Sequence, residues 1–407
     1  MLEYRTQGFN GCAVKYSPFF DSRLAVAASA NFGLVGNGKF YIFDLTPQGI
    51  VPLKWYTPTH PPTLNQNQKL FSSILKAIQQ EIFLANRLIQ IWFGLVLFTS
   101  FTTQDALYDL AWSEMNENQA LVGSGDGSIK LFDIAVDEFP VQGWKEHSRE
   151  VFAVHWNLVA KDRFCSSSWD GTVKIWTPSR QQSLLTLPTN SCTYSAAFSP
   201  HSPDLVSCVT SDSHLRVFDL RTPTSASNHL ALQIPVHGPS MTPIAIKPGM
   251  PPVNASTPPS EVLTHDWNKY RPTVVATAGV DRIVRTFDIR SPQQGPMSAM
   301  VGHEYAIRKL SWSPHLSHVL LTASYDMTAR VWTDGSEGGG MMVLGDEDGM
   351  RGGPGPGPSF GKELGRMGRH TEFVMGVDWC LFGSEGWAAS CGWDERLCVW
   401  DARAFMA

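Results

Sequence analysis

Three stretches of the sequence carry a histidine, a hydroxyl residue, an aspartate and a tryptophan in the same order. The hydroxyl lies four residues before the aspartate, and the histidine lies 23 or 24 residues before it. Such side chains could form a nucleophilic triad, a metal site or a structural chain of hydrogen bonds. The three sets are His147, Ser166, Asp170 and Trp176; His303, Thr322, Asp326 and Trp332; and His370, Ser390, Asp394 and Trp400.

The repetition of this pattern favours the structural interpretation. Equivalent positions of a repeated unit point alike and lie apart, so the three histidines are not expected to meet at one metal ion. We interpret the three sets as structural tetrads, and we predict no catalytic residue, no metal site and no cofactor. The glycine-rich stretches 33–38 and 123–128 fit β-turns rather than phosphate loops, because each precedes a predicted strand and not a helix.

The tetrads belong to a longer repeat. Six times an aromatic residue is followed by an aspartate after 14 or 15 residues, and by a second aromatic six residues later. A looser seventh copy consists of Tyr16, Asn37 and Phe43. Apolar and alternating stretches such as VFAVHW and AIRKLSW read as strands. The six sets are Trp112, Asp126, Phe132; Trp156, Asp170, Trp176; Phe198, Asp212, Phe218; Trp267, Asp281, Phe287; Trp312, Asp326, Trp332; and Trp379, Asp394, Trp400.

Seven copies predict an all-β fold, a seven-bladed WD-repeat β-propeller that fills residues 1–407 as a single domain. The first strand, near Leu2 to Thr6, is expected to complete the last blade. Closing the ring in this way leaves no long sheet edge exposed.

Three insertions interrupt the repeat, at 56–101, 235–260 and 333–369. The last two are rich in proline or glycine and read as extended loops. Residues 70–101 are apolar with helical spacing, which predicts an atypical, helical-looking insertion. A degenerate eighth blade, a membrane-active segment and translated intron sequence are the alternatives. A membrane span is disfavoured, because the longest charge-free apolar stretch, 88–101, has 14 residues and a span needs about 20.

Bulk composition excludes several classes of protein. The net charge of -5 argues against a general nucleic-acid binder, which needs a basic surface. The seven cysteines form no CxxC pair, so we expect buried free thiols in a reducing compartment. The first residues, MLEYRTQGFNGC, contain neither a basic nor an apolar stretch, so we expect no secretory signal. These features favour a binding platform over an enzyme.

The residue before each structural aspartate is expected in a turn at one rim of the propeller. Three of these residues are aromatic, namely Trp169, Tyr325 and Trp393, and they predict an apolar landing surface. The opposite interpretation is that they only pack under neighbouring loops. The entries to the inner strands on the same face carry acidic residues, which would suit a basic amphipathic helix. These acidic residues are Asp105, Asp109, Glu150, Glu261, Glu304 and Glu372.

The sequence resembles the peroxisomal import receptors for the type-2 targeting signal, the seventh-peroxin family. The segment 17–45, SPFFDSRLAVAASANFGLVGNGKFYIFDL, carries the resemblance most specifically. The segments KEHSREVFAVHW, GHEYAIRKLSWSPH and HTEFVMGVDW share it, and it spans nearly the whole chain outside the insertions.

This resemblance implies a receptor that binds a basic, amphipathic N-terminal helix on peroxisomal matrix proteins. It further implies a co-receptor peroxin, docking peroxins at the peroxisomal membrane, and cycling between the cytosol and the peroxisome matrix. A nucleic-acid partner and a direct membrane span are not expected. One alternative is a substrate receptor of a cullin-RING ubiquitin ligase, because three motifs resemble those of such propellers, namely FDLR (218–221), FDIR (287–290) and WDAR (400–403). A generic scaffold is a third interpretation.

Overall fold

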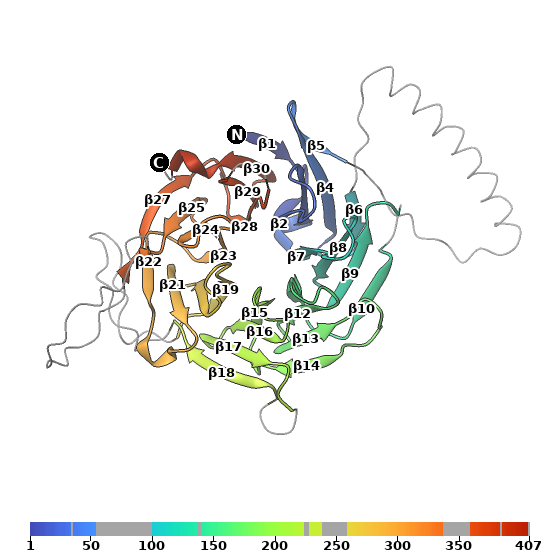
Figure 1. The fold of residues 1–407 in the computed structure, drawn as a ribbon. Helices are drawn as coiled ribbons and strands as arrows, with labels where there is room; N and C mark the ends of the chain where they lie inside the picture. Colours follow the sequence, from blue (N-terminus) through green and yellow to red (C-terminus); the bar gives the residue numbers. More distant parts are fainter. Residues whose placement is uncertain are drawn as a thin grey trace, which may run out of the picture.

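Each repeat forms one antiparallel sheet, and the computed structural model arranges seven such sheets radially around a common axis (Figure 1). The structure describes residues 1–33, 36–53, 100–136, 140–223, 228–237, 259–336, 359–382 and 385–405. The prediction of a seven-bladed all-β propeller is therefore confirmed. Within the described residues the helical elements are short 3-10 turns, η1 (Ala30–Gly33), η2 (Pro292–Gln294) and η4 (Ala402–Phe405).

The first four blades follow the chain in order, from the inner strand outward. Blade 1 contains β2 (Asn10–Tyr16), β3 (Arg23–Ser29), β4 (Gly38–Thr46), β5 (Gly49–Pro52) and β6 (Ser100–Thr103). Blade 2 contains β7 (Leu107–Trp112), β8 (Gln119–Ser124), β9 (Ser128–Asp133) and β10 (Gln142–Lys145). Blade 3 contains β11 (Val151–Trp156), β12 (Phe164–Ser168), β13 (Thr172–Trp176) and β14 (Leu185–Pro188). Blade 4 contains β15 (Thr193–Phe198), β16 (Leu205–Thr210), β17 (His214–Asp219) and β18 (Leu230–Pro235).

The last three blades complete the ring. Blade 5 contains β19 (Val262–Trp267), β20 (Val274–Gly279), β21 (Ile283–Asp288), β22 (Ser298–Val301) and the short parallel strand β26 (Ser359–Phe360). Blade 6 contains β23 (Ile307–Trp312), β24 (Val319–Ser324), β25 (Ala329–Thr333) and β27 (Lys362–Met367). Blade 7 contains β28 (Val374–Trp379), β29 (Trp387–Gly392) and β30 (Arg396–Asp401), and its outer strand is β1 (Leu2–Arg5).

The N-terminal strand closes the ring as the sequence predicts. Strand β1 pairs antiparallel with β30, with Leu2 opposite Val399 and Arg5 opposite Arg396. Both termini consequently lie in the same part of the ring (Figure 1). The pairing joins the two ends of the chain through backbone hydrogen bonds, and it covers the edge of β30 that would otherwise be exposed.

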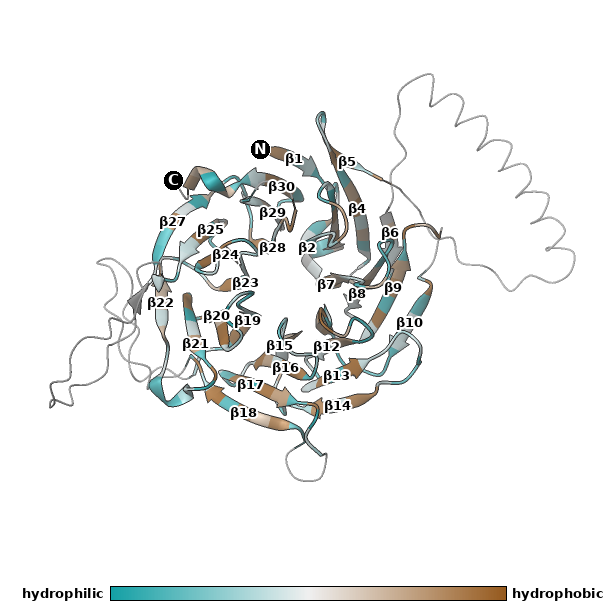
Figure 2. Ribbon diagram, in the orientation of Figure 1, coloured by the Kyte–Doolittle hydropathy of each residue, from teal (hydrophilic) through white to brown (hydrophobic). Residues whose placement is uncertain are grey.

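The hydrophobic core lies between neighbouring blades. One cluster joins Leu121, Ile129 and Trp144 of blade 2 to Trp156 and Trp176 of blade 3. Figure 2 shows apolar stretches along the strands of most blades. Burying large side chains at every blade junction stabilises the ring as a unit, because no single blade could cover its own two faces. All seven cysteines are free, and only Cys192 is not fully buried.

The outer strand of blade 1 consists of two pieces. Strand β5 pairs with one half of β4, where Phe43 is opposite Pro52, and β6 pairs with the other half, where Tyr41 is opposite Ser100. Between them, the Leu53 amide donates to the Ile42 carbonyl at 3.0 Å. Positions 53 and 100 are thus consecutive in the register of a single strand. The predicted helical-looking insertion therefore begins and ends inside this strand, and residues 54–99 lie outside the described residues.

This register makes a deletion experiment possible. Joining Leu53 directly to Ser100 removes residues 54–99, 46 in all, and leaves β4 with an uninterrupted partner strand. Closing a loop of this length in the chain costs on the order of 3 kcal/mol of conformational entropy. We expect the deletion variant to fold and to melt at the same temperature as the full chain or above it. A melting temperature lowered by several degrees would show that the segment is part of the folded unit.

The other two insertions are shorter in the structure than in the prediction. Residue 235 belongs to β18, and strands β26 and β27 occupy 359–360 and 362–367 within the predicted insertion 333–369. Residues 238–258 and 337–358 lie outside the described residues. Strand β27 is the outer strand of blade 6, so the chain after the glycine-rich stretch is needed to complete that blade. The part of the chain that the structure describes contains no helix long and apolar enough to span a membrane.

Candidate functional site

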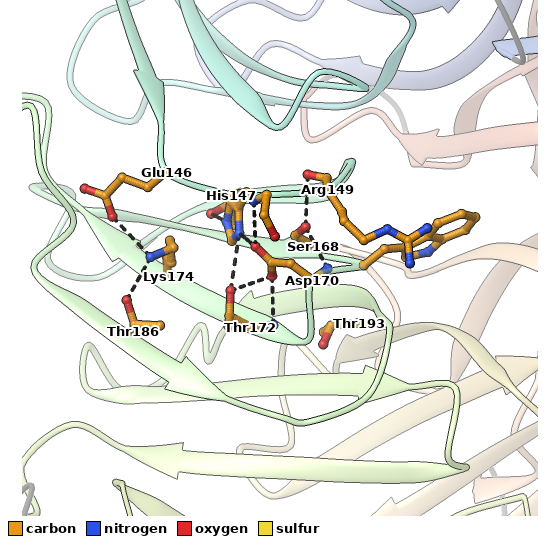
Figure 3. A network of polar contacts seen from close by, with 12 residues as sticks. Glu146, His147, Arg149, Ser168, Asp170, Thr172, Lys174, Thr186 and Thr193 are labelled. Atoms are coloured by element: carbon orange, nitrogen blue, oxygen red, sulfur yellow. Dashed lines mark hydrogen bonds and ion pairs between the residues drawn. The ribbon is translucent and has the colours of Figure 1, made fainter.

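The three predicted tetrads each form a continuous chain of hydrogen bonds. In blade 3, His147 Nδ1 lies 2.8 Å from Asp170 Oδ2, and its Nε2 lies 2.8 Å from Ser166 Oγ. The Trp176 indole donates to the same Ser166 oxygen at 2.8 Å. Figure 3 shows His147 and Thr172 beside the Asp170 carboxylate, with which both interact.

The other two tetrads repeat this arrangement with small variations. His303 lies 2.7 Å from both Asp326 and Thr322, and the Trp332 indole donates to Thr322 at 2.8 Å. In blade 7 the corresponding distances are 3.0 Å from His370 to Asp394 and Ser390, and 3.3 Å from Trp400 to Ser390. All three histidine side chains are fully buried. Because the polar groups of each tetrad hydrogen-bond to one another, none of the tetrads presents a reactive group to solvent.

The aspartates of these networks are held in the ionised form. Although burial opposes the charge of Asp170, hydrogen bonds from His147 and Thr172 hold the pKa of this carboxyl well below its usual range. The pKa of Asp326 is lowered in the same way. Burial lowers the pKa of His303 despite the attraction of Asp326, so this imidazole is neutral at physiological pH. A neutral imidazole between a carboxylate and a hydroxyl can satisfy both partners, which suits a structural role.

Each tetrad aspartate also fixes the turn that carries a predicted rim residue. The amides of Thr172 and Thr328 donate to Asp170 and Asp326 within these turns. The residue that follows the aspartate has a left-handed backbone, with φ of 79° at Gly171 and 64° at Met327. The residues just before the aspartates, Trp169 and Tyr325, are thereby placed at the surface end of the turn.

One face of the ring carries two clusters of aromatic side chains. The first cluster, which we call the blade 2–4 cluster, consists of Tyr108, Phe152, Trp169 and Tyr194. Phe152 stacks on Trp169 at 4.5 Å and on Tyr108 at 4.8 Å between ring centres, both with an interplanar angle of 11°. Tyr194 meets Phe152 and Trp169 edge-on, at 5.7 and 5.9 Å. All four side chains are half-buried, so each keeps an exposed edge or face.

The second cluster, the blade 6–7 cluster, consists of Tyr325, Phe373 and Trp393. The Phe373 ring centre lies 4.8 Å from Tyr325 and 5.1 Å from Trp393. These three side chains are also half-buried. The predicted rim aromatics therefore do not disappear beneath neighbouring loops. They pack against aromatic partners that lie outside the predicted set.

Three of the missed partners, Tyr108, Phe152 and Tyr194, come from a second regularity of the fold. In every inner strand the pairing with the second strand skips one residue, at the equivalent position of each blade. Such a skip marks a β-bulge, and the side chain there departs from the alternation between the two faces of a regular strand. Each residue at the shift lies four positions before the aromatic that ends its strand, so the offset was available in the sequence. The seven bulge residues are Cys12, Tyr108, Phe152, Tyr194, Leu263, Arg308 and Met375.

Five of the six predicted acidic residues lie at the strand entries as expected. Glu261, Glu304 and Glu372 are exposed, and Asp105 and Glu150 are half-buried. Glu261 accepts a hydrogen bond from the Tyr194 hydroxyl at 2.9 Å, which connects a carboxylate to the blade 2–4 cluster. Glu150 pairs with Arg149 at 3.5 Å, and the Arg149 guanidinium lies over the Trp169 ring.

Asp109 does not lie at the rim, contrary to the prediction. It is only 3% exposed, and its carboxylate accepts hydrogen bonds from Lys309 at 3.2 Å and from the Val154 amide at 3.3 Å. Lys309 belongs to blade 6 and Asp109 to blade 2, so this ion pair crosses the axis of the ring. The side chain lies on the axial side of its inner strand, one position beyond the bulge, and its charge is already neutralised.

This ion pair lines a cavity of about 190 Å³ at the axis, together with other polar and apolar side chains. Two further ion pairs line it, Lys15 with Asp378 at 2.9 Å and Lys269 with Asp266 at 2.8 Å. The histidines His155 and His265 also line this cavity, and burial lowers their pKa to about 3 and about 4. No group of three or more His, Cys, Asp or Glu within the described ranges has an arrangement suited to a metal ion.

The arginines of the three FDLR-type motifs are engaged locally. Each guanidinium is bidentate on the aspartate two residues earlier, with distances between 2.5 and 3.2 Å. The pairs are Asp219 with Arg221, Asp288 with Arg290, and Asp401 with Arg403. Nothing in this arrangement supports the ubiquitin-ligase alternative.

Comparison with known proteins shows which family has this architecture. The family described as WD domain, G-beta repeat matches residues 139–177, 181–219, 295–333 and 361–401. The peroxisomal targeting signal 2 receptor of Saccharomyces cerevisiae is 38% identical over 98% of this chain and 99% of its own length. The proteins of the same name from Komagataella phaffii and Mus musculus are 35% and 31% identical, over 99% and 98% of this chain and 99% and 95% of their own lengths.

Proposed function

This chain belongs to the family of peroxisomal targeting signal 2 receptors, and we propose that its aromatic face is where it holds the signal of its cargo. The function is accordingly that of a receptor in protein import into peroxisomes. The resemblance described from the sequence is confirmed. We further propose that the chain acts purely by binding, as a platform without catalytic activity.

The arrangement of apolar and acidic side chains on one face carries the proposal. The blade 2–4 and blade 6–7 clusters present half-buried rings, and exposed carboxylates stand beside them at Glu261, Glu304 and Glu372. A basic amphipathic helix could place its aliphatic side chains on the rings and its cations near the carboxylates. Aromatic side chains in such partly buried positions are the usual energetic anchors of an interface.

The partners follow from this proposal. The cargo consists of matrix proteins that carry a type-2 signal, and a co-receptor peroxin would cover the helix from the side that faces away from the propeller. Docking peroxins at the peroxisomal membrane would then receive the assembly. We propose that the receptor works in the cytosol and cycles to the peroxisome matrix.

A direct binding measurement tests the proposal. Fluorescence anisotropy of a labelled type-2 signal peptide, with and without the co-receptor, should show saturable binding to the purified chain. A scrambled peptide of the same composition should not bind. Equal affinity for both peptides would contradict a receptor function, since charge alone would then account for the binding.

The charge-reversal variant Glu150→Lys tests the acidic part of the face. The substitution places a second cation beside Arg149 and Trp169, so we expect the affinity for the signal peptide to fall roughly tenfold at low salt. Because Glu150 is partly exposed, the melting temperature should change little. Glu117→Lys changes the net charge equally in an exposed loop between β7 and β8, and should leave the affinity unchanged. An unchanged affinity in Glu150→Lys would remove this residue from the site.

A further inference from the structure

Arg308 is a buried cation that has no anionic partner among the residues that the structure describes. It is 7% exposed and occupies the bulge position of β23 in blade 6. Its guanidinium carbon lies 5.5 Å from the centre of the Phe152 ring, which belongs to blade 3. In the described part of the chain the guanidinium makes no ion pair and no hydrogen bond. Buried arginines are normally paired, because removing an unpaired charge from water is costly.

Three lysines near the axis are neutralised. Each of the three lysines has a carboxylate within 3.2 Å, and none of these carboxylates is left over for Arg308. The contact with Phe152 is a cation–π interaction, which offsets only part of the cost of burying the charge. The three neutralised pairs are Lys15 with Asp378, Lys269 with Asp266, and Lys309 with Asp109.

The position of Arg308 connects the two aromatic clusters. Its backbone belongs to blade 6, which also carries Tyr325, and its guanidinium lies over Phe152 of the blade 2–4 cluster. A polypeptide that contacts both clusters must therefore pass over this guanidinium. Its five N–H donors match a carboxylate in a bidentate geometry, and the Phe152 ring covers one side of the guanidinium.

We propose that Arg308 binds a carboxylate of the polypeptide that lies across the two clusters. This inference rests on the proposed function, and it adds an acidic group to a ligand otherwise recognised by its basic and aliphatic side chains. The carboxylate belongs to the cargo signal helix, because the co-receptor would cover that helix from the side that faces away from the propeller, and a coupled acid found on the co-receptor instead would overturn this assignment. The same guanidinium repels lysine and arginine from the axis, which directs the cations of the signal towards the outer carboxylates and sets the register of the helix.

The variant Arg308→Gln tests this role. We expect the affinity of the assembly that supplies the carboxylate to fall roughly 30-fold or more, since one side of a buried charge pair is removed. The melting temperature should stay equal or rise, because the free protein loses an uncompensated charge. Arg290→Gln is the control, an exposed arginine that follows β21 and lies outside both aromatic clusters, and it should leave the affinity unchanged.

A double-mutant cycle then identifies the source of the carboxylate. Each Glu or Asp of the signal peptide, and separately of the co-receptor, is changed to its amide and measured against wild-type and R308Q protein. Changing the acid that contacts Arg308 to its amide should weaken binding to the wild-type protein and should have little effect on binding to R308Q. If R308Q binds every assembly as the wild type does, the role of Arg308 is overturned and the proposed function stands. If the wild type binds no signal at all, both are overturned.

Discussion

Truncating Trp393 to alanine is expected to weaken binding of the signal peptide at least 30-fold, the equivalent of about 2 kcal/mol. Trp393 ends the blade 6–7 cluster, with its ring centre 5.1 Å from that of Phe373. Its backbone is held in place, because its amide donates to the Phe373 carbonyl and its carbonyl accepts from Asn10 at 2.6 Å. A ring fixed in this way loses little conformational entropy when a ligand packs on it.

Trp387→Ala is the matched control for this variant. Trp387 is a half-buried tryptophan of the same blade, at the start of β29, and it packs against the core between blades 7 and 1. Its truncation should lower the melting temperature and leave the peptide affinity within a few-fold. If Trp387→Ala and Trp393→Ala weaken binding equally, the loss reflects damage to blade 7, and the aromatic face is not the binding site.

The repeat pattern predicted the fold because its aromatic residues lie at or near strand ends. The first aromatic of each copy is the last residue of the inner strand, as Trp156 is of β11, and the second is the last or next-to-last residue of the third strand in blades 2 to 7, as Trp176 is of β13. This spacing gives the number of blades and the position of every turn. It cannot show that residues 53 and 100 are neighbours in one strand, since that register depends on pairing with β4.

The candidate site was predicted in part, for a physical reason. Trp169, Tyr325 and Trp393 were found because a turn aspartate marks their position. Their partners Phe152 and Phe373 were missed because they precede or occupy the bulge, where side chains depart from the alternation of a regular strand. The bulge also explains Asp109: beyond the shift, its side chain turns towards the axis and the ion pair with Lys309.

The variant Asp326→Ala is expected to lower the free energy of unfolding by about 3–5 kcal/mol, the largest stability loss we predict. Asp326 is 3% exposed in its side chain and accepts from Arg330 at 2.9 Å and from His303 at 2.7 Å. Removing the carboxylate leaves the Arg330 guanidinium, 2% exposed, with Glu363 as its remaining acidic partner. Urea denaturation followed by tryptophan fluorescence measures the change.

Asp126→Ala is the control, because it removes a turn aspartate that does not belong to a buried tetrad. Asp126 occupies the same position in blade 2, but its side chain is 25% exposed and its blade has no tetrad histidine, so we expect a loss of about 1 kcal/mol or less. Equal losses in the two variants would contradict a special role for the buried network.

Because Asp326 also fixes the turn that presents Tyr325, its substitution should weaken signal binding, whereas Asp126→Ala alters a turn whose rim residue is Gly125 and should not. Stability and recognition are therefore coupled through the same carboxylate, and a variant that lost 3 kcal/mol of stability while binding the signal normally would show that the rim does not depend on the network beneath it.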